Sequence, residues 1–214
     1  MTKILIVDDH SIVRKGLIQV LEEAGGYFEI GEAENGGEAM QKIREESWNI
    51  VLLDIAMPGK RGGEVLTQIK QECPKLPVLV LSSYPEEQYA VRLIRAGAAG
   101  YLNKQSAPEQ LIDAIKKVSE GKKFISSRVT NLLVESIVDQ NDDDNDQSLH
   151  EKLSDREFHV FLQLALGKPM TNIAQELSLS VKTVATYRTR LLEKMKMKSN
   201  AELTRYSIRN KLID

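Results

Sequence analysis

The sequence predicts an α/β protein in which five βα units build an open parallel sheet, followed by a smaller all-α domain. Two observations carry this prediction. Five short apolar runs in the first half alternate with segments whose apolar residues recur at helical spacing. The last third carries helical spacing instead, and it begins at a Ser-Asp-Arg-Glu sequence that is typical of a helix start.

The expected strands are short, and several are apolar at every position. Continuous hydrophobicity is what strands buried on both faces of a parallel sheet require, so we expect helices on both sides of the sheet. Glycine and proline separate the periodic segments, as turns between strands and helices need. The five strands are expected at residues 4–7, 28–33, 50–53, 78–81 and 100–102.

Polar residues of different chemistry follow four of these strands: Asp8 and Asp9, then Asp54, Ser82 and Lys104. In a parallel sheet all strands point their carboxyl ends to one edge, so these side chains are expected to meet there. Clustered carboxylates repel one another unless a cation neutralises them. Mg²⁺ prefers oxygen ligands and keeps positions that a phosphoryl group can take. The pattern therefore predicts a Mg²⁺ site that binds phosphate.

Composition is ordinary for a protein of one or two globular domains: 214 residues, 42% hydrophobic and 28% charged. The first apolar run is interrupted at Asp8, and no stretch approaches the roughly 18 apolar residues of a membrane span. We therefore expect a cytoplasmic protein without a membrane partner. A lone cysteine, Cys73, leaves no intramolecular disulfide to form.

Charge is distributed unevenly along the chain. The formal net charge is −4 for residues 1–120, −3 for 121–150 and +5 for 151–214, which carries 12 basic and 7 acidic residues. A basic last third is the candidate for contact with a phosphate backbone, whereas the acidic front is not. The two halves are therefore expected to do different work.

The middle of the chain predicts one further amphipathic helix around residues 129–137, followed by a polar, acidic linker at 139–147.

In the last third, Ser154 and Glu157 form a capping box, and Gly167 is placed to end that helix. Next we expect a short helix at 171–178, then a tight turn and a helix from Val181. Another capping box, at 199–202, begins a last helix that reaches residue 212. We expect three regions: 1–121, 122–150 and 151–214.

Residues 3–121 closely resemble a response-regulator receiver domain. The resemblance lies in Asp8-Asp9, Asp54-Ile55-Ala56-Met57-Pro58, Ser82 and Gly100-Tyr101-Leu102-Asn103-Lys104. It implies a flavodoxin-like, doubly wound sheet of order 2-1-3-4-5, with Asp54 phosphorylated by a sensor histidine kinase. It further implies that Asp9, Asp54 and the backbone carbonyl of Ala56 bind Mg²⁺ with support from Asp8. Lys104 would bind the phosphoryl oxygens, and Ser82 and Tyr101 would form a switch.

Residues 151–214 resemble the four-helix DNA-binding domain of the NarL/FixJ (LuxR-type) regulators. The resemblance lies in residues 153–157, Gly167, Ile173-Ala174, Leu177 and 180–184. It implies that the helix from Val181 reads the major groove and that the last helix pairs two such domains. If Val184, Leu191 and Met195 face the core, the expected phosphate contacts are Lys182, Thr183, Arg188 and Arg190, and the expected base contacts are Ala185, Thr186 and Thr189.

These features favour a transcriptional regulator of a two-component system that binds duplex DNA and forms a homodimer on phosphorylation. One alternative is a phosphohydrolase with Asp54 as nucleophile; haloacid-dehalogenase-like enzymes carry a second aspartate two residues later, where this chain has Ala56. The other is a regulator that works without phosphorylation through a vestigial receiver. The intact acidic set and Lys104 disfavour it, so we expect a regulator and not an enzyme.

Overall fold

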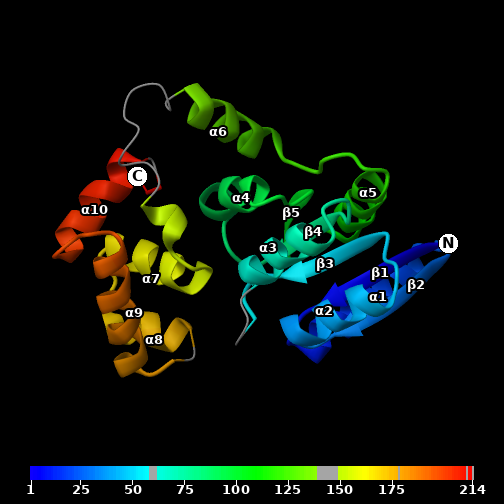
Figure 1. Ribbon diagram of the computed structural model, residues 1–214, viewed down its shortest axis with the longest axis horizontal. Helices are drawn as coiled ribbons and strands as arrows, with labels where there is room; N and C mark the ends of the chain where they lie inside the picture. Colours follow the sequence, from blue (N-terminus) through cyan, green and yellow to red (C-terminus); the bar gives the residue numbers. More distant parts are fainter. Residues whose placement is uncertain (58–61, 139–148, 178, 211, 214) are drawn as a thin grey trace. The chain divides into compact units, whose positions relative to one another are not determined.

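The computed structural model describes residues 1–57, 62–138, 149–177, 179–210 and 212–213, which form two compact units, Met1–Glu135 and Ser136–Asp214 (Figure 1). The acidic linker expected at residues 139–147 and Pro58 of the receiver motif lie outside the described residues. The region boundaries at 121 and 150 stay a prediction. Within the described ranges, no helix is both long and apolar enough to cross a bilayer.

The first unit is built on one five-stranded sheet whose pairs are all parallel and whose order is β2-β1-β3-β4-β5, as the sequence resemblance predicts. The two central strands, β3 and β4, are buried at every residue, which explains their uninterrupted hydrophobicity. The strands are β1 (Thr2–Val7), β2 (Phe28–Ala33), β3 (Ile50–Asp54), β4 (Val78–Ser82) and β5 (Gly100–Asn103).

Helices cover both faces of this sheet. α1 and α5 pack on the face that carries Ile4, Leu52 and Leu79, whereas the alternate strand residues face α2, α3 and α4. The Asn35 side chain accepts a hydrogen bond from the Glu38 N–H and so caps α2. The helices are α1 (Ser11–Glu23), α2 (Gly36–Glu45), α3 (Gly62–Glu72), α4 (Glu86–Arg95) and α5 (Pro108–Ser119).

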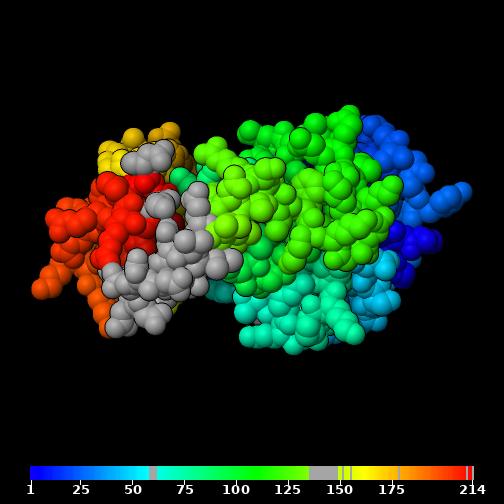
Figure 2. Space-filling view, turned by 90° about the horizontal axis from the view of Figure 1, so that it is seen from above, coloured from blue at the N-terminus to red at the C-terminus, as the bar shows by residue number. Residues whose placement is uncertain are grey.

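The chain stays attached to the sheet after α5. Phe124 N–H donates to the Ala99 carbonyl (2.9 Å), and Tyr101 N–H donates to the Phe124 carbonyl (3.3 Å), so residue 124 pairs with the outer edge of β5. A Cβ on Gly100 would lie 2.6 Å from the Phe124 oxygen, so this approach requires glycine. The next helix, α6 (Ser127–Val138), confirms the expected amphipathic helix, and Figure 2 shows its first part, up to residue 134, on the surface of the first unit.

The second unit is all-α, as predicted. α7 packs against α9 and α10, and α8 packs against α9. Phe158, Phe161 and Tyr206 form an aromatic group within its core, with ring centroids about 6 Å apart. The elements are a 3-10 turn, η2 (His150–Lys152), followed by α7 (Asp155–Ala165), α8 (Met170–Glu176), α9 (Val181–Lys194) and α10 (Asn200–Arg209).

Helix ends in this unit follow the sequence signals with two differences. The Ser154–Glu157 capping box is present, and Gly167 adopts φ +77° just after α7. Ser199 caps α10, but the Glu202 carboxylate accepts from the Lys198 N–H (2.9 Å) instead of closing a second box. α10 ends at Arg209, before the predicted Leu212. Leu212 N–H donates to the Ser207 carbonyl (2.8 Å), a bond typical of a helix C-terminus, and the Asn210 side chain donates to the Tyr206 carbonyl.

Candidate functional site

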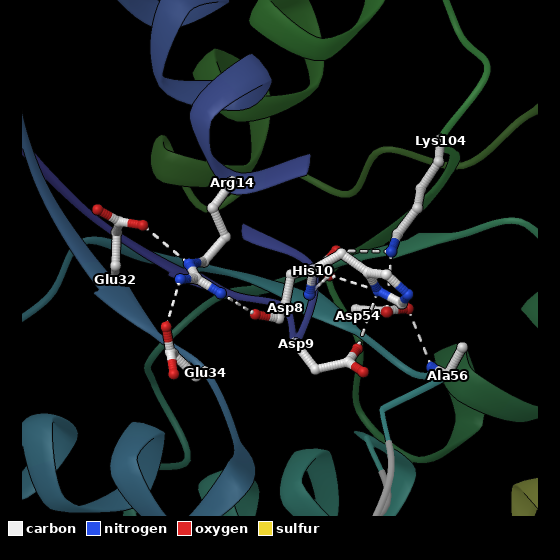
Figure 3. Close-up of polar contacts among 9 residues, drawn as sticks. All are labelled: Asp8, Asp9, His10, Arg14, Glu32, Glu34, Asp54, Ala56 and Lys104. Atoms are coloured by element: carbon white, nitrogen blue, oxygen red, sulfur yellow. Dashed lines mark hydrogen bonds and ion pairs between the residues drawn. The ribbon is translucent and has the colours of Figure 1, made fainter. Parts of the chain in front are cut away.

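Acidic side chains from the ends of β1 and β3 meet at the carboxyl edge of the sheet (Figure 3). Ligand atoms of Asp8, Asp9, His10 and Asp54 all lie within 4.8 Å of one another. Asp8 and Asp54 are buried, with 2% and 1% of their surface exposed, and Asp9 is half-buried. The structure therefore brings together the carboxylates that the sequence predicted to converge.

Lys104 reaches the same group from the end of β5. Its Nζ lies 2.6 Å from Asp8 Oδ2 and 2.8 Å from Asp54 Oδ2. Its backbone N–H donates to the Ser82 carbonyl (2.9 Å), which ties the ends of β4 and β5 together. Among the described residues, one ammonium faces three carboxylates, so this group keeps an excess of negative charge that a divalent cation would neutralise.

Burial raises the pKa of the Asp54 carboxyl; the Lys104 ammonium and the Ala56 N–H oppose this shift, and Asp8 adds to it. Burial lowers the pKa of Lys104, but the Asp54 and Asp8 carboxylates outweigh burial and raise it above its ordinary value. The ammonium is thus held in its charged form.

The residues present fit a divalent metal ion. Asp9 Oδ1 is buried and accepts no hydrogen bond from the described residues, although His10 Nδ1 lies 3.1 Å away. Ala56 N–H donates to Asp54 Oδ1 (2.9 Å), which holds the residue-56 backbone beside the carboxylate. An oxygen-rich set with an unsatisfied carboxylate oxygen is the ligand chemistry that Mg²⁺ prefers.

The helix α9 presents the second set of expected site residues. Val184, Leu191 and Met195 are buried, as the predicted core face requires. Four of the expected DNA contacts also make side-chain hydrogen bonds within the unit. Arg188 Nε donates to Asn200 Oδ1 (2.8 Å), and Thr183 Oγ1 lies 2.8 Å from Ser180 Oγ. The hydroxyls of Thr186 and Thr189 donate to backbone carbonyls of α9. Lys182, Thr186, Thr189 and Arg190 are exposed, and Thr183, Ala185 and Arg188 are half-buried.

Comparison with known proteins assigns both units. Residues 4–116, more than half of the chain, match the family described as the response regulator receiver domain, and residues 151–207 match bacterial regulatory proteins of the luxR family. This chain belongs to the response-regulator family. The response regulator UvrY of Escherichia coli (strain K12) is 34% identical over 212 residues, which cover 99% of this chain and 96% of UvrY.

Two solved structures of the response regulator RcsB share the fold of this response regulator. RcsB of Salmonella enterica serovar Typhimurium bound to promoter P1flhDC with the phosphomimetic BeF3⁻ is 26% identical, with a TM-score of 0.58, and the match covers 96% of this chain and 97% of RcsB. A structure of two RcsB dimers bound to two parallel DNAs is 25% identical, with a TM-score of 0.57 and 98% of each chain covered. The receiver and LuxR-type resemblance predicted from the sequence is confirmed.

In the receiver of this response regulator, Ser82 and Tyr101 meet at the turn between β4 and α4. Ser82 is fully buried, and its Oγ accepts from the Tyr84 N–H (3.1 Å). The Tyr101 ring is buried, and its hydroxyl donates to the Tyr84 carbonyl (2.7 Å). Burial raises the pKa of the Tyr101 hydroxyl, so it stays a hydrogen-bond donor. Both switch candidates therefore hold the backbone of one residue.

The start of α4 is linked to the segment that leaves the receiver, a contact that the sequence did not predict. Ser126 Oγ donates to Glu86 Oε1 (3.0 Å), and Arg128 Nη1 lies 2.9 Å from Glu87 Oε1. Val129 in the first turn of α6 is buried. Tyr84 lies two residues before Glu86, so a rearrangement at Tyr84 would be close to the contacts with Ser126 and Arg128.

Sequence reasoning also missed the surroundings of Arg14. This arginine lies within the apolar spacing of α1 and is buried, with its guanidinium between Glu32 and Glu34 and next to the Asp8 backbone (Figure 3). The available signal was a basic residue in the first turns of α1 and two alternate acids at the end of β2. That signal does not reveal that the groups meet.

Proposed function

We propose that Asp54 accepts a phosphoryl group from a sensor histidine kinase and that this modification controls the binding of the second unit to duplex DNA. The observation that carries the proposal is the meeting of Asp8, Asp9 and Asp54 with Lys104 in one pocket. These residues come from the ends of three strands, and an acidic pocket of this kind, with one fixed ammonium, suits phosphoryl transfer.

In the proposed step a carboxylate oxygen of Asp54 attacks phosphorus, and the bond between phosphorus and the imidazole nitrogen of the donor histidine breaks. Lys104 stabilises the negative charge that develops on the transferring oxygens. Asp9, Asp54 and the backbone carbonyl of Ala56 would hold Mg²⁺, with Asp8 in support. When bound, Mg²⁺ neutralises charge and orients the phosphoryl oxygens for in-line displacement.

The phosphoryl group adds negative charge and acceptor oxygens beside Ser82. We infer that the Ser82 hydroxyl turns toward these oxygens and gives up its contact with Tyr84. Because Tyr101 bonds the same residue through its carbonyl, the turn before α4 would then rearrange. The contacts of Glu86 with Ser126 and of Glu87 with Arg128 would carry that change to α6.

Binding of DNA is assigned to α9. Its exposed Lys182, Thr186, Thr189 and Arg190 form a polar and basic face opposite the buried Val184 and Leu191. The RcsB structures bound to promoter DNA and the RcsB dimers bound to DNA support this assignment and a homodimer of this response regulator on its operator. Two copies would double the number of phosphate contacts.

The same pocket favours a regulator over a phosphohydrolase. Rapid turnover of an aspartyl phosphate requires a second acid or base near the leaving group, and the position two residues after Asp54 is Ala56. Ala56 contributes its backbone to the pocket and no titratable group. We therefore expect no rapid turnover of small phosphate esters by the purified protein.

The test is phosphorylation of the full chain by acetyl phosphate with Mg²⁺, followed by mass spectrometry of the peptides. We expect one phosphoryl group, on Asp54, and none on the Asp54→Asn variant. Asp113→Asn is the matched control, because Asp113 is an exposed aspartate of α5 paired with Lys117. Modification of wild type and Asp54→Asn at equal levels, or steady release of phosphate from acetyl phosphate at an enzyme's rate, would contradict the proposal.

A further inference from the structure

The buried guanidinium of Arg14 joins three segments that meet beside the acidic pocket. Nε donates to Glu32 Oε2 (2.8 Å), Nη2 to Glu34 Oε1 (2.7 Å) and Nη1 to the backbone carbonyl of Asp8 (2.8 Å). The Arg14 side chain is 7% exposed, whereas the two glutamates are 44% and 67% exposed. Each of the three nitrogen atoms therefore has its own acceptor, on three different residues.

The residue that Arg14 holds by its backbone is one of the acidic pocket residues. Asp8 also donates its own N–H to the Ala33 carbonyl (3.1 Å), so the end of β1 is fixed from two sides by groups outside the pocket. The Asp8 side chain, in turn, accepts from the His10 N–H (2.8 Å) and contacts Lys104. A shift of the Asp8 backbone would therefore move the Asp8 and Asp9 carboxylates relative to Asp54.

The acceptors of Arg14 are themselves fixed. Glu34 N–H donates to Glu38 Oε2 (2.8 Å), and Lys42 pairs with Glu38 (3.0 Å) and contacts the Glu32 carbonyl. These contacts anchor the turn between β2 and the capped start of α2. Arg14 thus links the β1–α1 turn to a part of the receiver that has further hydrogen bonds of its own, and two carboxylates outside the metal pocket match its charge.

We propose that Arg14 is a positioning residue for the metal pocket: its three-way contact with Glu32, Glu34 and the Asp8 carbonyl sets the place of Asp8 and Asp9. The inference rests on the proposed function of this pocket. Partners that orient ligands from the second layer of a metal site commonly change metal affinity 10- to 100-fold when they are replaced. We expect Arg14 to act through the position of the Asp8 backbone and not through its charge, because the two glutamates neutralise its guanidinium.

The test measures Mg²⁺ binding to the full chain by isothermal calorimetry, together with urea unfolding of each variant. Arg14→Gln is expected to raise the Kd for Mg²⁺ about tenfold. Arg14→Lys keeps the charge but not the three-way geometry, so its affinity should stay several-fold weaker than that of wild type. Glu34→Ala removes one of the three acceptors and should raise Kd by about two- to threefold.

Arg44→Gln is the matched control. Arg44 makes two 2.8 Å hydrogen bonds to Glu72 between α2 and α3, away from the acidic pocket, and 56% of its side chain is exposed. Its Kd should equal that of wild type. At saturating Mg²⁺, phosphorylation of Arg14→Gln by acetyl phosphate should recover most of the wild-type rate, which a merely unstable protein would not do.

Three results would overturn the inference: a Kd of Arg14→Gln within twofold of wild type, full affinity in Arg14→Lys, or equal losses in Arg14→Gln and Arg44→Gln. If Arg14→Gln does not fold, Arg14→Lys and Glu34→Ala decide the question, and wild-type affinity in both would overturn the inference. Absence of Mg²⁺ binding by the wild-type protein is a different result, because it would contradict the proposed function of the pocket itself.

Discussion

The acidic pocket of the receiver and the exposed face of α9 place charge in opposite ways. In the pocket, residues up to 96 positions apart, Asp8 and Lys104, meet in a buried cluster. On α9, charged and polar residues follow one another along one helix and face solvent. A buried charge is costly without its partner, whereas an exposed one is screened. Single substitutions should therefore abolish function in the pocket and only reduce it on α9.

Removal of the Lys104 ammonium should have the largest effect. Lys104→Met is expected to lower the rate of phosphorylation by acetyl phosphate about 100-fold or more, because the ammonium that stabilises the transferring oxygens is lost. The rate is measured from the fraction of modified protein over time. Lys117→Met is the control, since Lys117 pairs with Asp113 on the exposed side of α5. A similar loss in both variants would contradict a specific role for Lys104.

Close packing around Asp54 predicts the next effect. A Cβ on Gly62 would lie 2.4 Å from the Asp54 carbonyl and 2.3 Å from Ile55 Cα. Gly62→Ala should lower the free energy of unfolding of the receiver by about 2 kcal/mol. Gly16→Ala in α1 meets nothing within 4 Å and should raise it by about 0.5–1 kcal/mol. Urea unfolding followed by the fluorescence of Trp48 reports on the receiver. If both substitutions changed the free energy of unfolding in the same direction, this prediction would be wrong.

The second unit holds a buried titratable group of its own. Burial, with smaller contributions from Arg156 and Lys168 against Glu176, lowers the pKa of His159 to about 4. Between pH 6.5 and 4 the unfolded chain binds a proton that the folded unit does not, so stability falls as the pH falls. Between pH 7 and pH 5 the free energy of unfolding of wild type should therefore fall by about 2 kcal/mol more than that of His159→Gln. Circular dichroism during urea unfolding measures this difference. The same pH dependence in wild type and in His159→Gln would contradict a lowered pKa for His159.

On α9 the effects should be graded. Arg190→Ala removes one exposed charge, so affinity should fall by a similar factor on all DNA sequences, and the log-log salt slope should shrink by about 0.9. Arg188→Ala should also lower stability, because it loses the bond to Asn200. Fluorescence anisotropy over a range of salt concentrations separates the two variants. An unchanged salt slope for Arg190→Ala would remove that residue from the DNA contacts.

The smallest expected effect is a gain. Lys196, just after α9, adopts φ 54°, a left-handed conformation that costs a residue with a side chain about 1 kcal/mol. Lys196→Gly should therefore raise the free energy of unfolding of the second unit by about 0.5–1 kcal/mol. Circular dichroism during urea unfolding tests this, and a loss of stability would show that the Lys196 side chain contributes contacts that outweigh the backbone strain.

The comparison also explains what the sequence could predict. Apolar runs predict the strands, helical spacing predicts the buried face of α9, and the family resemblance predicts the sheet order. The structure confirms all three. The meeting of Asp8, Asp54 and Lys104 follows from one rule of parallel sheets. The buried position of Arg14 and the contact of Glu86 with Ser126 depend on side-chain packing between segments far apart in the chain, and no local pattern encodes it.

The most direct test of the central claim is the affinity for operator DNA of wild type and Asp54→Ala, each with and without acetyl phosphate and Mg²⁺. The operator is first selected from a pool of random duplexes. Wild type is expected to bind more tightly after phosphorylation, and Asp54→Ala should show no response. Equal responses of the two proteins would contradict control of DNA binding through Asp54.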